Sequence, residues 1–141
     1  MPEANLKPRL RMTSLYFVAN TFNYLVAGTG NRSELEIGYF TKYGDGGVDM
    51  LPLGNLFKDQ VRTLARELDI PTPIIEKAPS AGLWLGQTDE NEMGFSYADL
   101  ELYLRENSKT LPVELTSRIE HLMRSSAHKR VLPPRPPEVD E

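Results

Sequence analysis

Two glycines lie in a short turn, Gly28-Thr29-Gly30-Asn31, just before a segment with the composition of a helix start, Arg32 to Glu36. An apolar tetrapeptide, Tyr24 to Ala27, precedes the turn and predicts a short buried strand. A strand, a glycine-bearing turn and a helix in succession outline a nucleotide site, because unpaired amides at a helix N-terminus attract anions. Two glycines alone are a weak signal, so this pattern predicts anion binding only in general terms.

Glu34 and Lys58 are the charged side chains that could act beside bound phosphate, and each has two interpretations. Glu34 lies three residues after Asn31, which suits a capping box in which the glutamate accepts from the cap amide. Alternatively, it is a hard oxygen ligand for Mg²⁺, which usually takes one or two carboxylates together with phosphate and water oxygens. Lys58 lies in the first turn of a later predicted helix, either as a solvated lysine or as a contact for a phosphate bound between its ammonium and the helix amides.

The remaining candidates favour structural roles when each is taken alone. The basic residues around Arg9 would spread about a helix as solvated charge. His128-Lys129-Arg130 follows a predicted helix end, where the macrodipole favours cations. A zinc site is not expected, because His121 is the only other histidine and thiolates are absent. Ser80 lies in a Pro-Ser-Ala-Gly context, which is not a Gly-x-Ser-x-Gly nucleophile elbow.

Composition narrows the classes of function. The 141 residues, 40% hydrophobic and 26% charged, suit one globular domain or part of one. A formal net charge of −4 argues against a protein that neutralises a nucleic-acid backbone. The absence of cysteine excludes disulfides, thiolate metal sites and a cysteine nucleophile. No apolar run approaches a membrane span and the first residues lack a signal-peptide core, so we expect a cytoplasmic setting without membrane contact.

Helices are expected to position the candidate side chains of the first half of the chain. Apolar residues at three- and four-residue steps predict an amphipathic helix over about 9–21. A second apolar stripe, over Leu53 to Leu68, predicts a helix that is capped by Asn55 and stops before Ile70-Pro71-Thr72-Pro73. Between them, Asp45-Gly46-Gly47 predicts a turn in which the glycines supply positive φ.

The second half is expected to be a loop followed by two helices. Residues 78–91 are rich in Gly, Ser and Gln, which predicts a long surface loop of the kind that often forms a lid. A capping box from Ser96 to Asp99 opens a predicted helix over about 97–106. A last helix is expected over about 112–126, and the proline-rich residues after it predict an extended tail.

Four segments resemble one known family: NLKPRLRM (5–12), GTGNRSELEIGYFTKYGDGGVDMLPLGNLFK (28–58), KAPSAGLWLGQTDENEMGFSY (77–97) and HKR (128–130). Over nearly its whole length the chain resembles the ammonia-dependent NAD synthetases, which belong to the ATP pyrophosphatases. The resemblance implies an α/β fold, namely the C-terminal part of an adenine-nucleotide α-hydrolase-like, Rossmann-like parallel sheet with several helices.

The resemblance also implies a ligase activity. Members of the family use ATP as co-substrate and Mg²⁺ as cofactor to adenylate the nicotinate carboxylate of deamido-NAD (nicotinic acid adenine dinucleotide), which releases pyrophosphate. Ammonia then displaces AMP to give NAD. The implied partners are deamido-NAD, ATP and ammonia, in a homodimer, with neither nucleic acid nor membrane.

Nine residues match positions with a role in the family. Those that resemble ATP contacts are Thr29, Lys58 and Ser80; the match to the Mg²⁺ ligand is Glu34; those that match deamido-NAD contacts are Arg9, Lys42, Asp49, His128 and Lys129. The resemblance therefore favours the functional interpretation of Glu34 and Lys58. In the stretch TKYGDGGVD, it predicts that the glycine turn sets the separation of Lys42 and Asp49.

One feature of the family is missing from these residues. Its pyrophosphate-binding loop, Ser-Gly-Gly-x-Asp-Ser, has no counterpart here, so residues 1–127 are expected to be the C-terminal portion of a synthetase domain without the N-terminal half. Residues 128–141 are expected to carry the substrate-contacting HKR and the tail. We expect such a chain to hold substrate-side residues but not to turn over alone. The alternative is a non-catalytic fragment or interaction module that retains the fold remnant.

Overall fold

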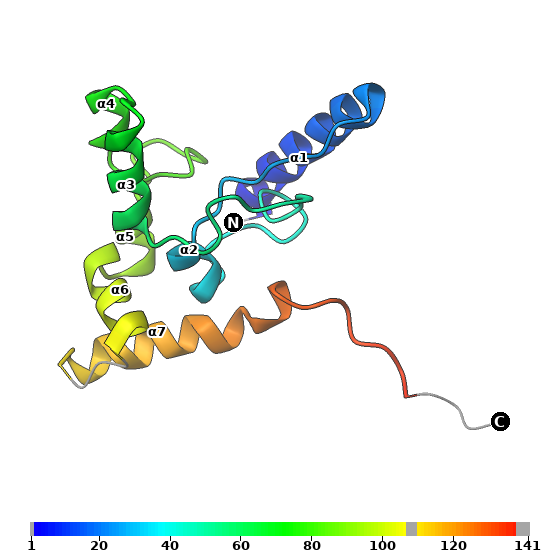
Figure 1. Ribbon diagram of the computed structural model, residues 1–141. Helices are drawn as coiled ribbons and strands as arrows, with labels where there is room; N and C mark the ends of the chain where they lie inside the picture. Colours follow the sequence, from blue (N-terminus) through cyan, green and yellow to red (C-terminus); the bar gives the residue numbers. More distant parts are fainter. Residues whose placement is uncertain (1, 107–109, 138–141) are drawn as a thin grey trace.

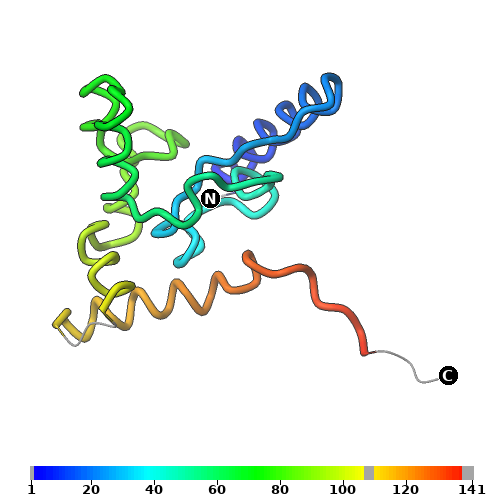
Figure 2. Tube along the Cα trace, in the orientation of Figure 1, coloured from blue at the N-terminus to red at the C-terminus, as the bar shows by residue number. Residues whose placement is uncertain are grey.

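Helices arranged in an open layout dominate the computed structural model, which describes residues 2–106 and 110–137. Helix α1 (Pro2–Phe22) forms one arm and helices α3 (Lys58–Glu67) and α4 (Thr72–Ile75) form another (Figure 1). Helix α7 (Val113–Ser125) runs along the foot of the molecule, and the tail leaves from its end (Figure 2). Within the described residues, no helix is long and apolar enough to cross a membrane.

Helix α1 is longer than the predicted span 9–21, and its apolar side chains are not buried. The side chain of Phe17 is 74% exposed, and Leu10, Leu15 and Phe22 are also exposed, whereas Ala19 is buried. The predicted helix is confirmed, but no element of the described residues covers its apolar stripe. A contiguous exposed apolar surface of this kind is unusual on a monomeric soluble protein.

The predicted parallel sheet is not formed within the described residues. Its one trace is an isolated parallel bridge between Ala27 and Met50. The amide of Gly28 donates to the Met50 carbonyl at 2.8 Å, and the amide of Asp49 donates to the Val26 carbonyl at 2.9 Å. An isolated pairing of two strands is marginally stable, and a stable sheet needs three or more strands or packing against a helix. The prediction of a buried strand over Tyr24 to Ala27 was therefore wrong in extent, and Tyr24 itself is exposed.

Helix α2 (Arg32–Ile37) begins and ends as its sequence requires. The Asn31 side chain accepts from the Glu34 amide, and the Glu34 carboxylate accepts from the Asn31 amide, so the predicted capping box is confirmed. The helix ends at Gly38, whose φ of 67° is left-handed. A Cβ built on Gly38 would lie 2.2 Å from the Cβ of Ser126, so both backbone conformation and space require glycine there.

The turn over Asp45-Gly46-Gly47 is confirmed, but its glycines serve close approach and not positive φ. The Asp45 carboxylate accepts from the Thr41 amide at 2.9 Å and closes the turn. The positive φ of this stretch, 61°, falls on Tyr43. A Cβ on Gly46 would lie 2.4 Å from the ring of Phe40, so the glycine makes room for that ring.

Helix α3 is not capped by Asn55, contrary to the prediction. It begins at Lys58, and Phe57 occupies the cap position without a side-chain cap bond. The predicted stop before Pro71 is confirmed, although the two prolines then open the short helix α4. Asn55 is not needed as a cap, because the carboxylate of Glu101, on a later helix, accepts from the Lys58 amide.

The core lies where α2, α5 (Asp89–Met93), α6 (Tyr97–Glu106) and α7 meet, and η1 (Ala127–Lys129) follows α7. Its buried side chains are Ile37, Met93, Phe95, Tyr97, Leu100 and Ile119. The capping box of Ser96 and Asp99 and both predicted helix spans are confirmed. The loop predicted over residues 78–91 is confirmed as far as residue 88, whereas residues 89–91 belong to α5. Residues 131–137 are extended, and the tail's last four residues lie outside the described part.

Candidate functional site

Four side chains, Glu34, Lys58, Asp89 and Tyr97, meet as one group, here called the inner cluster. The Lys58 ammonium lies 3.0 Å from Glu34 Oε1 and 5.1 Å above the centre of the Tyr97 ring. The Tyr97 hydroxyl lies 3.3 Å from Glu34 Oε1 and donates to Asp89 Oδ2 at 2.9 Å. The cluster thus joins the first turns of four helices, α2, α3, α5 and α6.

Burial sets the electrostatics of the inner cluster. It raises the pKa of the Asp89 carboxyl above its usual range, although Tyr97 and Lys58 partly offset the shift. Burial, followed by the charges of Glu34 and Asp89, strongly raises the pKa of the Tyr97 hydroxyl, which therefore stays protonated. Asp89 Oδ1 is a buried oxygen without a hydrogen-bond partner among the described residues. A cation or a further donor in the cluster would satisfy that oxygen.

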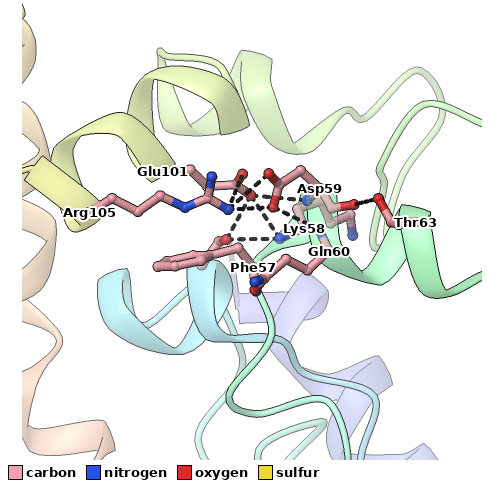
Figure 3. A network of polar contacts seen from close by, with 8 residues as sticks. Phe57, Lys58, Asp59, Gln60, Thr63, Glu101 and Arg105 are labelled. Carbon is pink, nitrogen blue, oxygen red and sulfur yellow. Dashed lines mark hydrogen bonds and ion pairs between the residues drawn. The ribbon is translucent and has the colours of Figure 1, made fainter.

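A second network holds the start of α3 and is drawn in Figure 3. Glu101 Oε1 on α6 accepts from the Lys58 amide at 2.7 Å and from the Ser33 hydroxyl at 3.0 Å. The Asp59 amide also lies 3.4 Å from this oxygen. Glu101 therefore supplies the cap that Asn55 was predicted to supply. A phosphate at Lys58 would meet the ammonium but not these helix amides, contrary to the predicted geometry.

Burial raises the pKa of Glu101, the negative charge of Asp59 adds to the shift, and the hydrogen bonds from Ser33 and Lys58 oppose it. On the other side of the network, the Arg105 guanidinium donates to both oxygens of the Asp59 carboxylate, at 2.7 and 2.8 Å. The same guanidinium lies 4.5 Å above the centre of the Phe57 ring. Two residues one turn apart on α6 thus hold the first turn of α3.

A cavity of about 740 Å³ opens beside the inner cluster, between the first half of α1, the loop 38–48 and the segment 80–92. Of the nine predicted site residues, five line it: Thr29, Glu34, Lys58, Ser80 and Lys129. The structure therefore brings the three predicted ATP contacts and the predicted metal ligand to one cavity. The Ser80 hydroxyl accepts from the Gly82 amide at 3.1 Å, which orders the turn at its rim.

The other four predicted residues, Arg9, Lys42, Asp49 and His128, do not line this cavity and are called the outer group. Arg9 Nε donates to the Lys42 carbonyl at 3.4 Å, and the Lys42 ammonium donates to the His128 carbonyl. Asp49 accepts from the Val26 amide at 2.7 Å and from the Tyr16 hydroxyl at 2.9 Å. Three members are thus linked to one another through backbone carbonyls, while Asp49 supports the bridged segment.

Lys129 lines the cavity, but its ammonium is directed to backbone. It donates to the carbonyls of Gly38 and Phe40, both at 2.8 Å. Burial lowers the pKa of Lys129; Asp45 opposes the shift and Arg130 adds to it. The residue holds the loop that follows α2, and a ligand would have to compete with two carbonyls for its ammonium.

Asp89 and Tyr97 of the inner cluster and Glu101 of the second network were not among the predicted site residues. Asp89 and Tyr97 lie in the quoted segment 77–97, where the fold alone reveals that they converge. Glu101 lies on the buried side of a helix that was predicted, and a carboxylate at a buried helical position was the available signal.

No group of three or more His, Asp or Glu side chains in the described ranges is arranged to hold a metal ion. The donors that the inner cluster offers are two carboxylates, Glu34 and Asp89, one of which has an unpartnered oxygen. One or two carboxylates suffice for Mg²⁺ when phosphate and water complete its coordination. The donor set therefore fits Mg²⁺ with a nucleotide and does not suit a protein-only cage.

Comparison with known proteins gives one consistent result. The family described as NAD synthase matches residues 1–133. The chain is 60% identical over 130 residues to an NH(3)-dependent NAD(+) synthetase of Carboxydothermus hydrogenoformans, covering 92% of this chain and 53% of that protein. It is 58% identical over 134 residues to the protein of the same name from Archaeoglobus fulgidus, covering 94% and 54%.

Solved structures agree with these relatives. An NMN synthetase from Francisella tularensis matches with a TM-score of 0.89 and 47% identity, over 94% of this chain and 55% of that one. An NH3-dependent NAD synthetase from Campylobacter jejuni matches with a TM-score of 0.69 and 31% identity, over 97% and 54%. These neighbours are consistent with the predicted α/β class. The chain spans about half the length of the proteins that it matches.

Proposed function

Because the chain belongs to the NAD synthase family, we propose that it carries part of the site of an ammonia-dependent NAD synthetase, which amidates deamido-NAD through an adenylated intermediate. The observation that carries this proposal is the meeting of Glu34 and Lys58, 3.0 Å apart, at a cavity that Thr29 and Ser80 also line. A carboxylate is a poor electrophile, so its oxygen must become part of an AMP leaving group before ammonia attacks.

In this proposal, Lys58 binds the phosphates of ATP. Its ammonium uses one of three N–H groups on Glu34, and the cavity gives the others access to phosphate oxygens. The Tyr97 ring below it attracts the ammonium through a cation–π contact. Lys58 would thus hold the negative charge of the pyrophosphate as it departs.

Glu34 is the proposed Mg²⁺ ligand, with Asp89 beside it. The capping box fixes the Glu34 carboxylate through Oε2, which accepts from the Asn31 amide at 3.0 Å. The structural and the chemical interpretation of Glu34 are therefore compatible, because the cap orients the ligand. When bound, the metal would neutralise part of the charge on the phosphates.

The outer group and Lys129 are the proposed contacts of deamido-NAD. Lys42 would exchange the His128 carbonyl for a ligand phosphate or carboxylate, a stronger charge-assisted partner. We also propose that α1, with Leu10 and Phe17 exposed, lies against another polypeptide surface in a homodimer, and that the protein acts in the cytoplasm. Since the relatives are about twice as long, we propose that turnover needs the remainder of the synthetase domain.

Calorimetric titration of the chain with ATP, magnesium and deamido-NAD tests this function. Binding of either nucleotide, weakened by Lys58→Met and Glu34→Gln, is expected. Absence of binding at millimolar concentration, together with recovery of a protein partner, would favour the non-catalytic interaction module. Formation of AMP and NAD after addition of ammonia measures turnover, and robust turnover by this chain alone would contradict the need for further segments.

A second candidate differs in the substrate. The Francisella tularensis structure named NMN synthetase has the TM-score of 0.89, which favours a mononucleotide acid as the carboxylate to be amidated. Parallel titrations with nicotinate mononucleotide and deamido-NAD discriminate between the two. Preference for the mononucleotide would replace the dinucleotide in the proposal and leave the roles of Glu34 and Lys58 unchanged.

A further inference from the structure

Glu101 lies where one of its carboxylate oxygens contacts the first turns of both α2 and α3. Its side chain is 7% exposed, and it does not line the cavity. Oε1 accepts from the Ser33 hydroxyl on α2 and from the Lys58 amide on α3. The Ser33 oxygen in turn lies 3.2 Å from the same Lys58 amide, so the three groups close a small network.

The residues that Glu101 holds are those that carry the inner cluster. Ser33 directly precedes Glu34, and Lys58 receives the bond on its own backbone. The side chains of Glu34 and Lys58 then meet 3.0 Å apart on the cavity side. The distance between the first turn of α2 and the first turn of α3 decides whether these side chains meet. Glu101 fixes that distance through its contacts on the side away from the cavity.

The residue at the cap position of α3, Phe57, makes no side-chain cap bond, so the start of this helix depends on a contact from another helix. Phe57 offers no side-chain acceptor, while Gln60 and Asp59 bond to amides within their own turn. A carboxylate is favoured at a helix N-terminus by both the free amides and the dipole. Glu101, 43 residues away from Lys58 in the chain, provides it.

We propose that Glu101 is a positioning residue of the nucleotide site, holding α2 and α3 so that Glu34 and Lys58 face one ligand. The identity of the ligand rests on the proposed function. The claim that Glu101 positions Glu34 and Lys58 can be tested without any ligand. Glu101 touches neither the cavity nor the proposed metal ligand, and it acts on them through the two helix starts that it joins; its other oxygen lies 3.9 Å from Arg105 on the same helix.

The test uses the whole chain with Glu101→Gln and Glu101→Ala. Asp99→Asn is the matched control, because it weakens the cap of α6 and leaves the contacts to Ser33 and Lys58 in place. Nuclear magnetic resonance of the ligand-free proteins reports the Lys58 ammonium nitrogen and the exchange of the Lys58 and Asp59 amides. All measurements are made well below the temperature midpoint of unfolding of each variant, so that a change in the signals does not arise from unfolded protein.

In the Glu101 variants, the Lys58 ammonium signal is expected to move toward that of an exposed lysine. The two amides should exchange about 10- to 100-fold faster, as for the loss of a hydrogen bond to a charged group. Asp99→Asn should change neither. If Glu101→Ala does not fold, Glu101→Gln carries the test, since it keeps the shape and loses the charge. An unchanged Lys58 signal in a folded variant overturns the proposal.

Titration with magnesium and inorganic pyrophosphate separates this proposal from the proposed function. Binding by the unaltered chain, about tenfold weaker in Glu101→Gln and unchanged in Asp99→Asn, is expected. Equal affinity in Glu101→Gln, or equal loss in both variants, would reduce Glu101 to a purely structural residue. If the unaltered chain does not bind pyrophosphate, the proposed function fails, and the resonance measurements still decide whether Glu101 positions Lys58.

Discussion

The inner cluster and the outer group each contain charged residues that the sequence singled out, yet the structure places them in different surroundings. In the inner cluster, side chains contact side chains: Lys58 meets Glu34, and Tyr97 joins both carboxylates. In the outer group, Arg9 and Lys42 donate to backbone carbonyls. The side chains of the inner cluster thus contact one another directly, whereas in the proposed dinucleotide site Arg9 and Lys42 would have to exchange backbone carbonyls for a ligand.

The two regions also differ in how they are placed relative to the core. Tyr97 and Glu101 lie on α6 beside Leu100, which is fully buried against the core. The outer group lies on α1, on residues 42–49 and on η1, none of which contributes a side chain to that core. We therefore expect substitutions in the core to disturb the inner cluster more than the outer group.

The largest effect is expected from Leu100→Ala. Removing a fully buried leucine should lower the free energy of unfolding by about 2–5 kcal/mol, through lost transfer energy and a residual cavity. Urea unfolding followed by circular dichroism measures it. The control is Leu85→Ala, at a fully exposed leucine, which should stay within about 0.5 kcal/mol. A similar loss in both variants would mean that the core does not support α6 as described.

Lys58→Met should weaken binding of magnesium pyrophosphate by about 10- to 100-fold, because a charge-assisted contact is lost while the stem is kept. Calorimetry measures the affinity. Lys42→Met removes a lysine of the outer group and should leave pyrophosphate affinity unchanged. If both lysines mattered equally, the distinction between the two regions would not hold.

Lys42→Ala is expected to weaken deamido-NAD binding by roughly 3- to 10-fold, since Lys42 must first leave the His128 carbonyl. ATP binding should change much less. Fluorescence or calorimetric titration with both nucleotides measures the ratio, in a protein that contains the complete synthetase domain. Equal losses for both ligands would assign Lys42 to folding of the loop.

The smallest effect concerns Lys129 and pH. Burial places its folded-state pKa below the usual 10.5, so between these two values the unfolded chain binds more protons than the folded chain. The free energy of unfolding should therefore rise with pH in that window, relative to Lys129→Met. Urea unfolding of both proteins at a series of pH values measures the difference. A difference that falls with rising pH would mean that Lys129 is held as a cation by Asp45 and not chiefly desolvated.

Local signals predicted the helices well where the cap is also local. The boxes of Asn31 with Glu34 and of Ser96 with Asp99 each span three residues, and both were found in place. Asn55 failed as a cap because the acceptor for the start of α3 comes from Glu101 on another helix. A cap from a residue 43 positions away cannot be predicted from the sequence around the helix start.

The candidate site was also predictable only in part, because some of its contacts join residues that are far apart in the sequence. Glu34 and Lys58 follow from a recognisable turn and from family resemblance, and the structure places them together. Asp89 and Tyr97 carry no signal by type or spacing, because their partnership with Glu34 exists only once α5 and α6 pack. The sheet was overpredicted, since the apolar run Tyr24 to Ala27 finds a single bridge in the described residues.

Trp84 gives the cavity an optical property of its own. It is the one tryptophan of the 141 residues, it lines the cavity, and its side chain is 40% exposed. Indole emission depends on the polarity and water contact of its surroundings, so a ligand that displaces water beside Trp84 changes the colour and intensity of the light. The unmodified chain therefore contains a single native fluorophore at the cavity.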